Sequence, residues 1–367
     1  MIWNNFGMDE PWGTNNLSDT DTSLDSFEDN FVTKERLPDS RQYLEGLAKL
    51  KSKNIKDKEL LPALSKAKQS HLERLVDSNS TTILNDLDLD QPIASSTLKT
   101  YCLITGASQG IGREISIQFA KKVADGSTFL LLARNLNNLN ETKKMMNEVN
   151  DKINVFVHSF NFYEPISFEL HTIINQSLDA FKKDVEDFDL AMIVHNAGSL
   201  GDVSEFTYDM KNIEKLTSYF MLNLFSVCIL NAEFVKTFDA DKRQPDLRLL
   251  NKGCDICVVN ITSLCAIKPF ASMGYYCVGK ASREMFFSVM AEENKNYLVL
   301  NYSPGPVLTD MTDEIISNIR NEEVKEMFTK MKKDSTILSA EESIGKLVKI
   351  LQHRNFKSGD RIDFYET

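Results

Sequence analysis

The feature that most constrains the fold is a regular alternation of short apolar runs with stretches of helical length. The runs occupy residues 101–105, 128–133, 152–159, 189–195, 254–261, 297–302 and 361–365. Runs that are apolar on both faces and joined by helices indicate a parallel sheet covered by helices on both sides. The pattern therefore predicts an α/β domain over residues 98–367, with a doubly wound seven-stranded parallel sheet in the order 3-2-1-4-5-6-7.

Residues 1–97 lack this alternation and are predicted to be a separate N-terminal extension. Residues 1–30 carry seven Asp or Glu and no Lys or Arg, which predicts disorder. Residues 38–76 contain two amphipathic segments, and an acidic linker follows them. These helices have too few apolar residues for a large core, so they pack on the main domain, bind a protein partner or stay solvated.

The segment L-P-D-S-R-Q-Y-L-E-G-L-A-K-L together with A-L-S-K-A-K-Q-S-H-L-E-R-L resembles the coiled-coil domain-containing protein 32 family of small adaptor-type proteins. This resemblance implies a protein partner for residues 38–76. A generic charged helical hairpin is the alternative interpretation of the same residues.

Charge and composition exclude several functions. The formal net charge is −11 and no run is rich in Lys or Arg, which argues against a nucleic-acid surface. The first residues have neither the basic nor the apolar region of a signal peptide, and no apolar stretch is long enough to span a membrane. We therefore expect a cytoplasmic protein whose six cysteines are free thiols. Cys254 and Cys257 form a C-x-x-C without a second pair or nearby His, so we expect no metal site.

The first strand runs directly into T-G-A-S-Q-G-I-G, which contains Gly106, Gly110 and Gly112. Glycines allow a tight turn and let the backbone approach a pyrophosphate, which then meets the N-terminus of the following helix. A strand before the motif and a helix after it favour this interpretation over an ordinary strand–helix turn.

The end of the second strand indicates which dinucleotide binds. Enzymes that use NAD place an acidic residue there for the ribose 2′-hydroxyl. This chain has Ala133 followed by Arg134, which suits a 2′-phosphate and favours NADPH. The fourth strand ends in H-N-A-G, where Asn196 and Gly198 are expected to bring backbone close to the adenine ribose.

Tyr276 and Lys280 are four residues apart, so on a helix they share one face. Ser263 follows the apolar run 256–261. A neighbouring ammonium favours the phenolate and lowers the pKa of a tyrosine from its usual value of about 10. Together the three side chains are predicted to form a proton donor for a carbonyl group that is being reduced. The alternative is an amphipathic helix with an incidental Tyr and Lys.

T-G-A-S-Q-G-I-G, H-N-A-G, Asn223, Ser263 and Y-x-x-x-K, in this order, resemble the short-chain dehydrogenase/reductase family, whose fold is of Rossmann type. Within it, N-A-G-S-L-G-D-V-S, S-L-C-A-I-K-P-F, L-N-Y-S-P-G-P-V-L-T-D-M and F-K-S-G-D-R-I-D-F-Y are similar to the sepiapterin reductases over residues 100–367. The resemblance implies a homodimer that reduces side-chain ketones of pterins with NADPH, in tetrahydrobiopterin biosynthesis. A broad dicarbonyl reductase and an NADPH-binding interaction protein are the alternatives.

The resemblance also implies roles for individual residues. The pyrophosphate would be wrapped by Gly106, Ala107, Ser108, Gln109, Gly110, Ile111 and Gly112. Arg134 and Asn135 would hold the 2′-phosphate, and Asn161 and Phe162 would flank the adenine. The nicotinamide side would be closed by Val307, Leu308, Thr309, Asp310, Met311 and Thr312. The sequence departs from the family at Asn161, where Asp is usual, and at His195, where Asn is commoner.

For the reaction, the resemblance implies that Tyr276 donates the proton and that Ser263 hydrogen-bonds the carbonyl oxygen. Lys280 would bind the nicotinamide ribose and lower the pKa of Tyr276. Asn223 would hold a water that links Lys280 to solvent, although a hydrogen-bonded core Asn that bends its helix is the alternative. Gly305 would touch the substrate, and Asp363 would anchor the pterin ring by accepting two parallel hydrogen bonds.

Overall fold

The computed structural model describes residues 97–164, 167–239 and 254–366. The predicted disorder of residues 1–30, the amphipathic segments of residues 38–76 and the linker that follows them lie outside the described residues. The fold below is that of the predicted reductase domain.

Seven parallel strands form one sheet in the order β3-β2-β1-β4-β5-β6-β7, as the sequence predicts. The strands are β1 (Thr100–Thr105), β2 (Thr128–Ala133), β3 (Asn154–Ser159), β4 (Leu190–His195), β5 (Asp255–Ile261), β6 (Tyr297–Ser303) and β7 (Arg361–Asp363). Every residue of β1, β2 and β4 is buried, which is why these strands are apolar on both faces.

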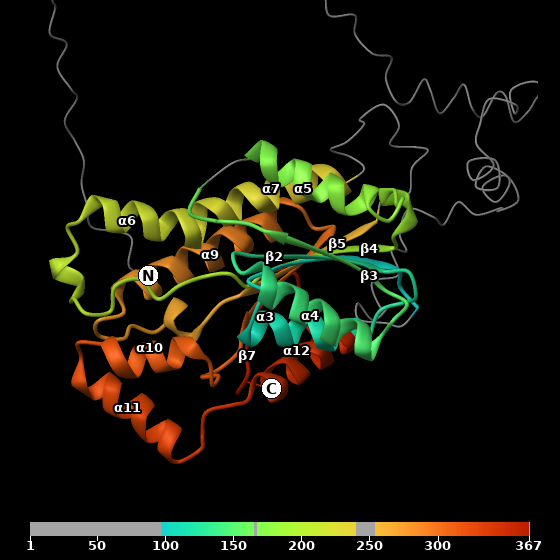
Figure 1. Ribbon diagram of the computed structural model, residues 1–367. Helices are drawn as coiled ribbons and strands as arrows, with labels where there is room; N and C mark the ends of the chain where they lie inside the picture. The colour runs from blue at the N-terminus through green and yellow to red at the C-terminus, as the bar shows by residue number, and fades with distance from the viewer. Residues whose placement is uncertain (1–96, 165–166, 240–253, 367) are drawn as a thin grey trace, which may run out of the picture. The chain divides into compact units, whose positions relative to one another are not determined.

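Helices cover both faces of the sheet (Figure 1). One face packs against α3 (Gly110–Ala120), α4 (Leu136–Val149) and α12 (Ala340–His353). The other packs against α5 (Ser167–Asp179), α7 (Ser226–Phe238) and α9 (Gly274–Glu293). Alternate side chains of β1 enter the two cores: Cys102 and Ile104 face the α3 side, and Tyr101 and Leu103 face the α5 side.

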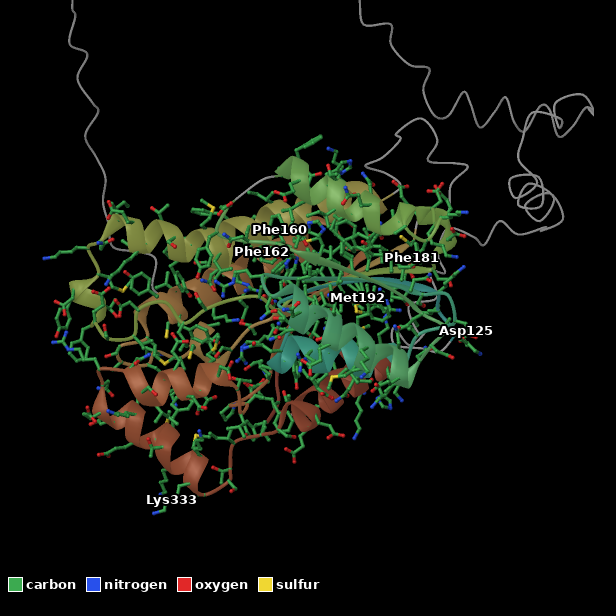
Figure 2. The ribbon with its side chains drawn as sticks, in the orientation of Figure 1. Asp125, Phe160, Phe162, Phe181, Met192 and Lys333 are labelled. Carbon is green, nitrogen blue, oxygen red and sulfur yellow. The ribbon has the colours of Figure 1, made fainter. Side chains whose placement is uncertain are left out.

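Aromatic residues hold the segment that leaves β3. Phe160 and Phe162 pack edge to face with ring centroids 4.8 Å apart, and both are buried on the α5 side of the sheet (Figure 2). This packing fixes the chain at the carboxyl edge of β3, where a ligand of such a sheet binds.

The helix before the gap at residues 240–253 is continuous from Ile213 to Phe238. It comprises α6 (Ile213–Phe220), a π-helical turn at Met221–Phe225 and α7. By length and composition it is apolar enough to cross a membrane. Leu230, Phe234 and Phe238 are buried against the sheet, so the α7 part of this helix packs in the core.

The carboxyl edge of the sheet carries polar residues in one row. The strand register pairs His195 with Asn260, Asn260 with Asn301, and Asn301 with Arg361. A third apolar cluster lies beyond this edge and contains Leu200, Met273 and Ile315. It supports α10 (Asp310–Asn318) and α11 (Glu322–Lys333), which pack on each other at that end.

His195 generates a prediction about stability and pH. Burial first, and then the charge of Arg283, lowers the pKa of its imidazole to about 3. In the unfolded chain the usual value is about 6.5, so on acidification the unfolded state binds a proton that the folded state does not. Stability is therefore lost as pH falls from about 6.5 towards 3, by at most about 4 to 5 kcal/mol from this group.

We expect His195→Asn to remove this contribution, so that wild type loses more unfolding free energy than the variant between pH 7 and pH 4. Urea unfolding of both proteins across this range measures the difference. A gap between wild type and variant that stays constant with pH would contradict the assignment.

Candidate active site

The glycine loop between β1 and α3 adopts the left-handed conformation, which favours glycine, at two positions. Gly106 has φ +68° and Gly110 has φ +55°. A Cβ on Gly106 would lie 2.8 Å from Nδ2 of Asn196, and a Cβ on Gly112 would lie 2.2 Å from the carbonyl oxygen of Gly106. The backbone is thus packed tightly at the N-terminus of α3, where a phosphate is favoured.

A cavity of about 740 Å³ opens above this loop at the carboxyl ends of the strands. Most of the predicted cofactor residues line it: Gly106, Ser108, Gln109, Gly110, Ile111, Arg134, Asn135, Phe162, Asn196, Thr309, Asp310 and Met311. The glycine loop and the start of α10 are joined across the cavity, because Nε2 of Gln109 donates to Oδ2 of Asp310 (2.7 Å). The size of the cavity and the basic residue Arg134 at the end of β2 fit a dinucleotide.

The remaining predicted cofactor residues, Ala107, Gly112, Asn161, Lys280, Val307, Leu308 and Thr312, are not among the described residues that line this cavity. Asn161 is exposed and its Nδ2 donates to Oε1 of Glu164 (2.9 Å). Tyr163 lines the cavity instead, with its ring centroid 5.9 Å from Cζ of Arg134. Tyr163 was missed by the sequence analysis, and its signal was an aromatic residue directly after Phe162.

A second cavity, of about 430 Å³, contains all four predicted substrate residues: Ser263, Tyr276, Gly305 and Asp363. Val307 and Thr312 also line it. Ile111, Thr309 and Met311 line both cavities, so the two adjoin. Three apolar side chains of α11 form a wall that the sequence analysis missed: Met327, Phe328 and Met331. Their helical spacing, i, i+1 and i+4, is equally typical of a core helix.

Ser263 and Tyr276 both line this cavity. Ser263 follows β5 and begins the short helix Leu264–Ala266, where its Oγ accepts from the N–H of Cys265 (3.2 Å). Tyr276 lies in the first turn of α9. Burial, and next the nearby Cys265, raises the pKa of the Tyr276 phenol, and a hydrogen bond with Ser263 opposes that shift. The phenol therefore carries its proton at neutral pH.

Lys280 is only 6% exposed and donates from Nζ to the carbonyl oxygen of Ile261 (2.6 Å). Its Nζ lies 5.5 Å from the ring centroid of Tyr276. Burial, followed by the charge of Arg283, lowers the pKa of the Lys280 ammonium well below its usual value. The sequence predicted that Lys280 lowers the pKa of Tyr276. In the structure the pKa of Tyr276 is raised instead, because burial of the phenol dominates.

Asn223 occupies the π-helical turn between α6 and α7 and is buried. Its Oδ1 accepts from the N–H of Ser199 (2.9 Å), and its Nδ2 donates to the carbonyl oxygen of Tyr219 (2.9 Å) and to Oγ of Ser199 (3.2 Å). These contacts match the alternative of a hydrogen-bonded core Asn at an irregular helix turn. The water link to Lys280 stays a prediction.

Arg283 is a central residue that the sequence analysis missed. It is completely buried on α9, and its guanidinium donates to the carbonyl oxygens of His195 (2.5 Å) and Ala197 (2.9 Å) and to Oδ1 of Asn260 (3.1 Å). It thereby holds the chain on both sides of Asn196. The signal was present, since Arg283 lies three residues after Lys280 and so shares its helix face.

The family model described as short chain dehydrogenase matches residues 100–320, so the chain belongs to the short-chain dehydrogenase family. The solved structure of a short chain dehydrogenase from Shigella flexneri complexed with NADP has the same fold. It aligns with a TM-score of 0.56 and 21% identity over 74% of this chain and 98% of that one.

Two curated relatives are sepiapterin reductases. That of Xenopus tropicalis is 33% identical over 270 residues, which cover 72% of this chain and 96% of the relative. That of Mus musculus is 30% identical over 267 residues, which cover 72% and 96%. The predicted membership of this family and the similarity to the sepiapterin reductases are confirmed. Membership of this family makes the protein an oxidoreductase that uses a nicotinamide cofactor.

The glycine loop generates the second prediction. Gly106→Ala forces a side chain into the left-handed region and against Asn196, so we expect a loss of about 1 to 3 kcal/mol in unfolding free energy. Gly345→Ala is the matched control, because Gly345 lies in α12 and its added Cβ would meet only Oε1 of Gln118 at 3.8 Å. Urea unfolding midpoints compare the two; equal midpoints would show that the loop is not strained as described.

Proposed function

We propose that the protein is an NADPH-dependent carbonyl reductase of the sepiapterin reductase type. Its substrates are pterins with a side-chain ketone, sepiapterin or 6-pyruvoyl-tetrahydropterin, and its pathway is tetrahydrobiopterin biosynthesis. One observation carries the proposal: a proton-donating pair, Ser263 and Tyr276, shares a cavity with the carboxylate of Asp363, and that cavity adjoins the dinucleotide cavity. The similarity to sepiapterin reductases over nearly their whole length supports it.

The cofactor would be held by the glycine loop, Asn196 and the start of α10. A bound nicotinamide dinucleotide supplies the hydride. Arg134 at the end of β2 favours the 2′-phosphate of NADPH, because a guanidinium pairs well with phosphate oxygens and no acidic residue stands there to bind a free ribose hydroxyl. Tyr163 stacks beside Arg134 and supports its orientation.

Tyr276 is the proton donor in this proposal. Its raised pKa keeps the phenol protonated until negative charge develops on the carbonyl oxygen. The Ser263 hydroxyl then donates a hydrogen bond to the same oxygen and fixes the substrate beside the phenol. Lys280, buried and tied to Ile261, holds this face of α9 against the end of β5.

Asp363 is the anchor for the pterin ring. Its side chain is 10% exposed and lines the substrate cavity, and the amino-pyrimidinone edge of a pterin donates an N–H group that this carboxylate accepts. A second candidate function is a broad dicarbonyl reductase. The apolar wall formed by Met327, Phe328 and Met331 favours it, since that surface binds small apolar ketones without any need for Asp363.

We also propose that a second copy of the chain covers the outer face of α9. Val278, Met285 and Val289 are exposed there, and Phe225 is exposed on the adjoining helix. Four large apolar side chains on two neighbouring helices suit a self-complementary helical interface. A protein partner for residues 38–76 remains a separate proposal.

The function is tested by following cofactor oxidation at 340 nm with sepiapterin and, separately, with butane-2,3-dione. We expect sepiapterin to be the better substrate in kcat/KM, and NADPH to be preferred over NADH because of Arg134. Turnover of the diketone alone would leave a reductase and reject the pterin assignment. Binding of NADPH without turnover of either substrate would reject the enzymatic proposal.

Tyr276→Phe tests the proton donor. We expect kcat to fall by about 10² to 10⁴-fold, because general acid catalysis is lost, while NADPH binding measured by fluorescence is retained. Tyr275→Phe is the matched control. That neighbouring hydroxyl donates to Oε1 of Glu205 (3.1 Å), so its removal is expected to leave turnover close to wild type. Retained turnover in Tyr276→Phe would contradict the assignment of Tyr276 as the proton donor.

A further inference from the structure

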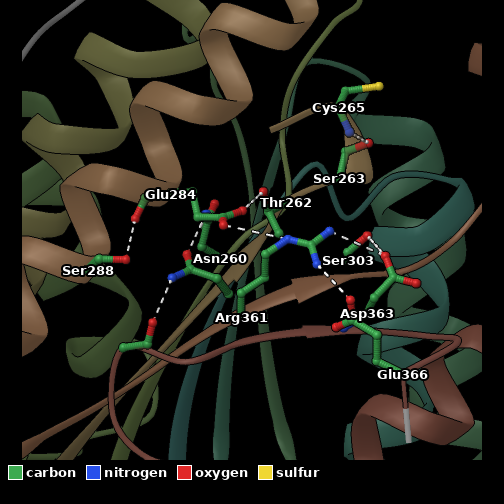
Figure 3. Close-up of polar contacts among 12 residues, drawn as sticks. Asn260, Thr262, Ser263, Cys265, Glu284, Ser288, Ser303, Arg361, Asp363 and Glu366 are labelled. Carbon is green, nitrogen blue, oxygen red and sulfur yellow. Dashed lines mark hydrogen bonds and ion pairs between the residues drawn. The ribbon is translucent and has the colours of Figure 1, made fainter. Parts of the chain in front are cut away.

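One guanidinium meets three carboxylates at the edge of the substrate cavity (Figure 3). Arg361 opens β7, and its side chain is 13% exposed. Its Nη2 lies 3.3 Å from Oδ2 of Asp363, its Nε 3.5 Å from Oε1 of Glu284, and its Nη1 3.6 Å from Oε1 of Glu366. Each carboxylate is approached by a different nitrogen, which only a planar guanidinium provides.

Glu284 connects this cation to the catalytic elements. It lies four residues after Lys280 on α9, so the two side chains share the face that packs on the sheet. Its Oε2 accepts from the hydroxyl of Thr262 (2.6 Å), and Thr262 directly precedes Ser263. A continuous chain of polar contacts therefore runs from Thr262, the neighbour of the serine, through Glu284 and Arg361 to Asp363, the proposed pterin anchor (Figure 3).

The contacts of Asp363 define which of its lone pairs a ligand can use. Oδ2 already accepts from the hydroxyl of Ser303 (2.5 Å) and from Arg361, and Oδ1 accepts from the N–H of Tyr365 (3.1 Å). A carboxylate offers about four acceptor positions, so about one position, on Oδ1, is open to a ligand. In this arrangement Asp363 therefore accepts one hydrogen bond from a ligand, and not the two parallel bonds expected from the sequence. Arg361 and Ser303 thus fix the plane of the carboxylate and direct Oδ1 towards a donor.

Charge balance gives Arg361 a second effect. Asp363 and Glu284 are both largely buried, and an unpaired buried carboxylate is costly. Burial raises the pKa of Glu284, while its hydrogen bond from Thr262 and the charge of Arg361 oppose that shift. Arg361 is the cation that both carboxylates share, so among the described residues its loss would leave Asp363 held by Ser303 and Tyr365 alone, and Glu284 by Thr262 alone.

We propose that Arg361, which is held by Glu284, is a positioning residue. By fixing the Asp363 carboxylate, it lets that carboxylate bind ligands whose ring edge donates an N–H group. The inference rests on the proposed function and adds a specificity mechanism to it. Ligands without such an edge, like small diketones, are indifferent to Arg361. The effect is therefore expected in KM for pterins, whereas the chemical step at Tyr276 is unaffected.

The test is Arg361→Lys, with kcat and KM measured at saturating NADPH for sepiapterin and for butane-2,3-dione. Lysine keeps the charge but reaches one carboxylate at a time. We expect KM for sepiapterin to rise by about 10-fold, with kcat within about two-fold and the diketone constants unchanged. Glu284→Gln keeps an acceptor for Thr262 and loses the ion pair with Arg361. We therefore expect it to raise KM for sepiapterin by less than Arg361→Lys does.

Glu366→Gln is the matched control, because Glu366 also contacts Arg361 but is 57% exposed and contributes little. Its KM values are expected to equal those of wild type. An unchanged KM for sepiapterin in folded Arg361→Lys and Glu284→Gln overturns the inference while the proposed function stands. An equal rise in KM for sepiapterin and for butane-2,3-dione in these variants also overturns the inference. A wild-type protein that reduces the diketone and not sepiapterin rejects the proposed function, and the inference with it.

Discussion

The buried guanidinium of Arg283 is the interaction on which the arrangement of the site depends. A charge without access to water is tolerated only when its donors are satisfied. Each nitrogen of the Arg283 guanidinium has an acceptor: the carbonyl oxygen of His195 at the end of β4, the carbonyl oxygen of Ala197 after it, and the amide oxygen of Asn260 on β5. Because Arg283 lies on the same face of α9 as Lys280, these bonds set how the catalytic helix lies on the sheet. Burial, and after it this positive charge, lowers the pKa of Lys280 and of His195.

The sheet register extends this constraint across the edge. His195, Asn260, Asn301 and Arg361 stand side by side on four neighbouring strands. Asn260 accepts from Arg283 and donates to Oδ1 of Asn301 (2.9 Å), so its amide is used on both sides. The two amides are thus used within the row, whereas Nδ1 of His195 and Nε of Arg361 are buried without a hydrogen-bond partner among the described residues. The last strand delivers Asp363 to the substrate cavity.

Two adjoining cavities follow from this geometry. Parallel strands present all their carboxyl ends at one edge, so the glycine loop after β1 and the serine after β5 open on the same side. Ile111, Thr309 and Met311 separate the cavities, and the Gln109–Asp310 hydrogen bond joins the loop to α10 above them. Tyr276 lines the second cavity, which adjoins the first at this shared wall.

The sequence by itself determined the parallel sheet, its strand order and the membership of the family, because these depend on periodicity and on local motifs such as T-G-A-S-Q-G-I-G. It also placed Ser263, Tyr276, Gly305 and Asp363 in one cavity. Only the tertiary structure decided the upward pKa shift of Tyr276, since burial depends on residues far away in the chain. The same reason explains why Arg283, Tyr163, the α11 wall and the Glu284–Arg361 pair escaped sequence analysis: their partners are distant in sequence and meet only when α9, α11 and β7 reach the carboxyl edge of the sheet.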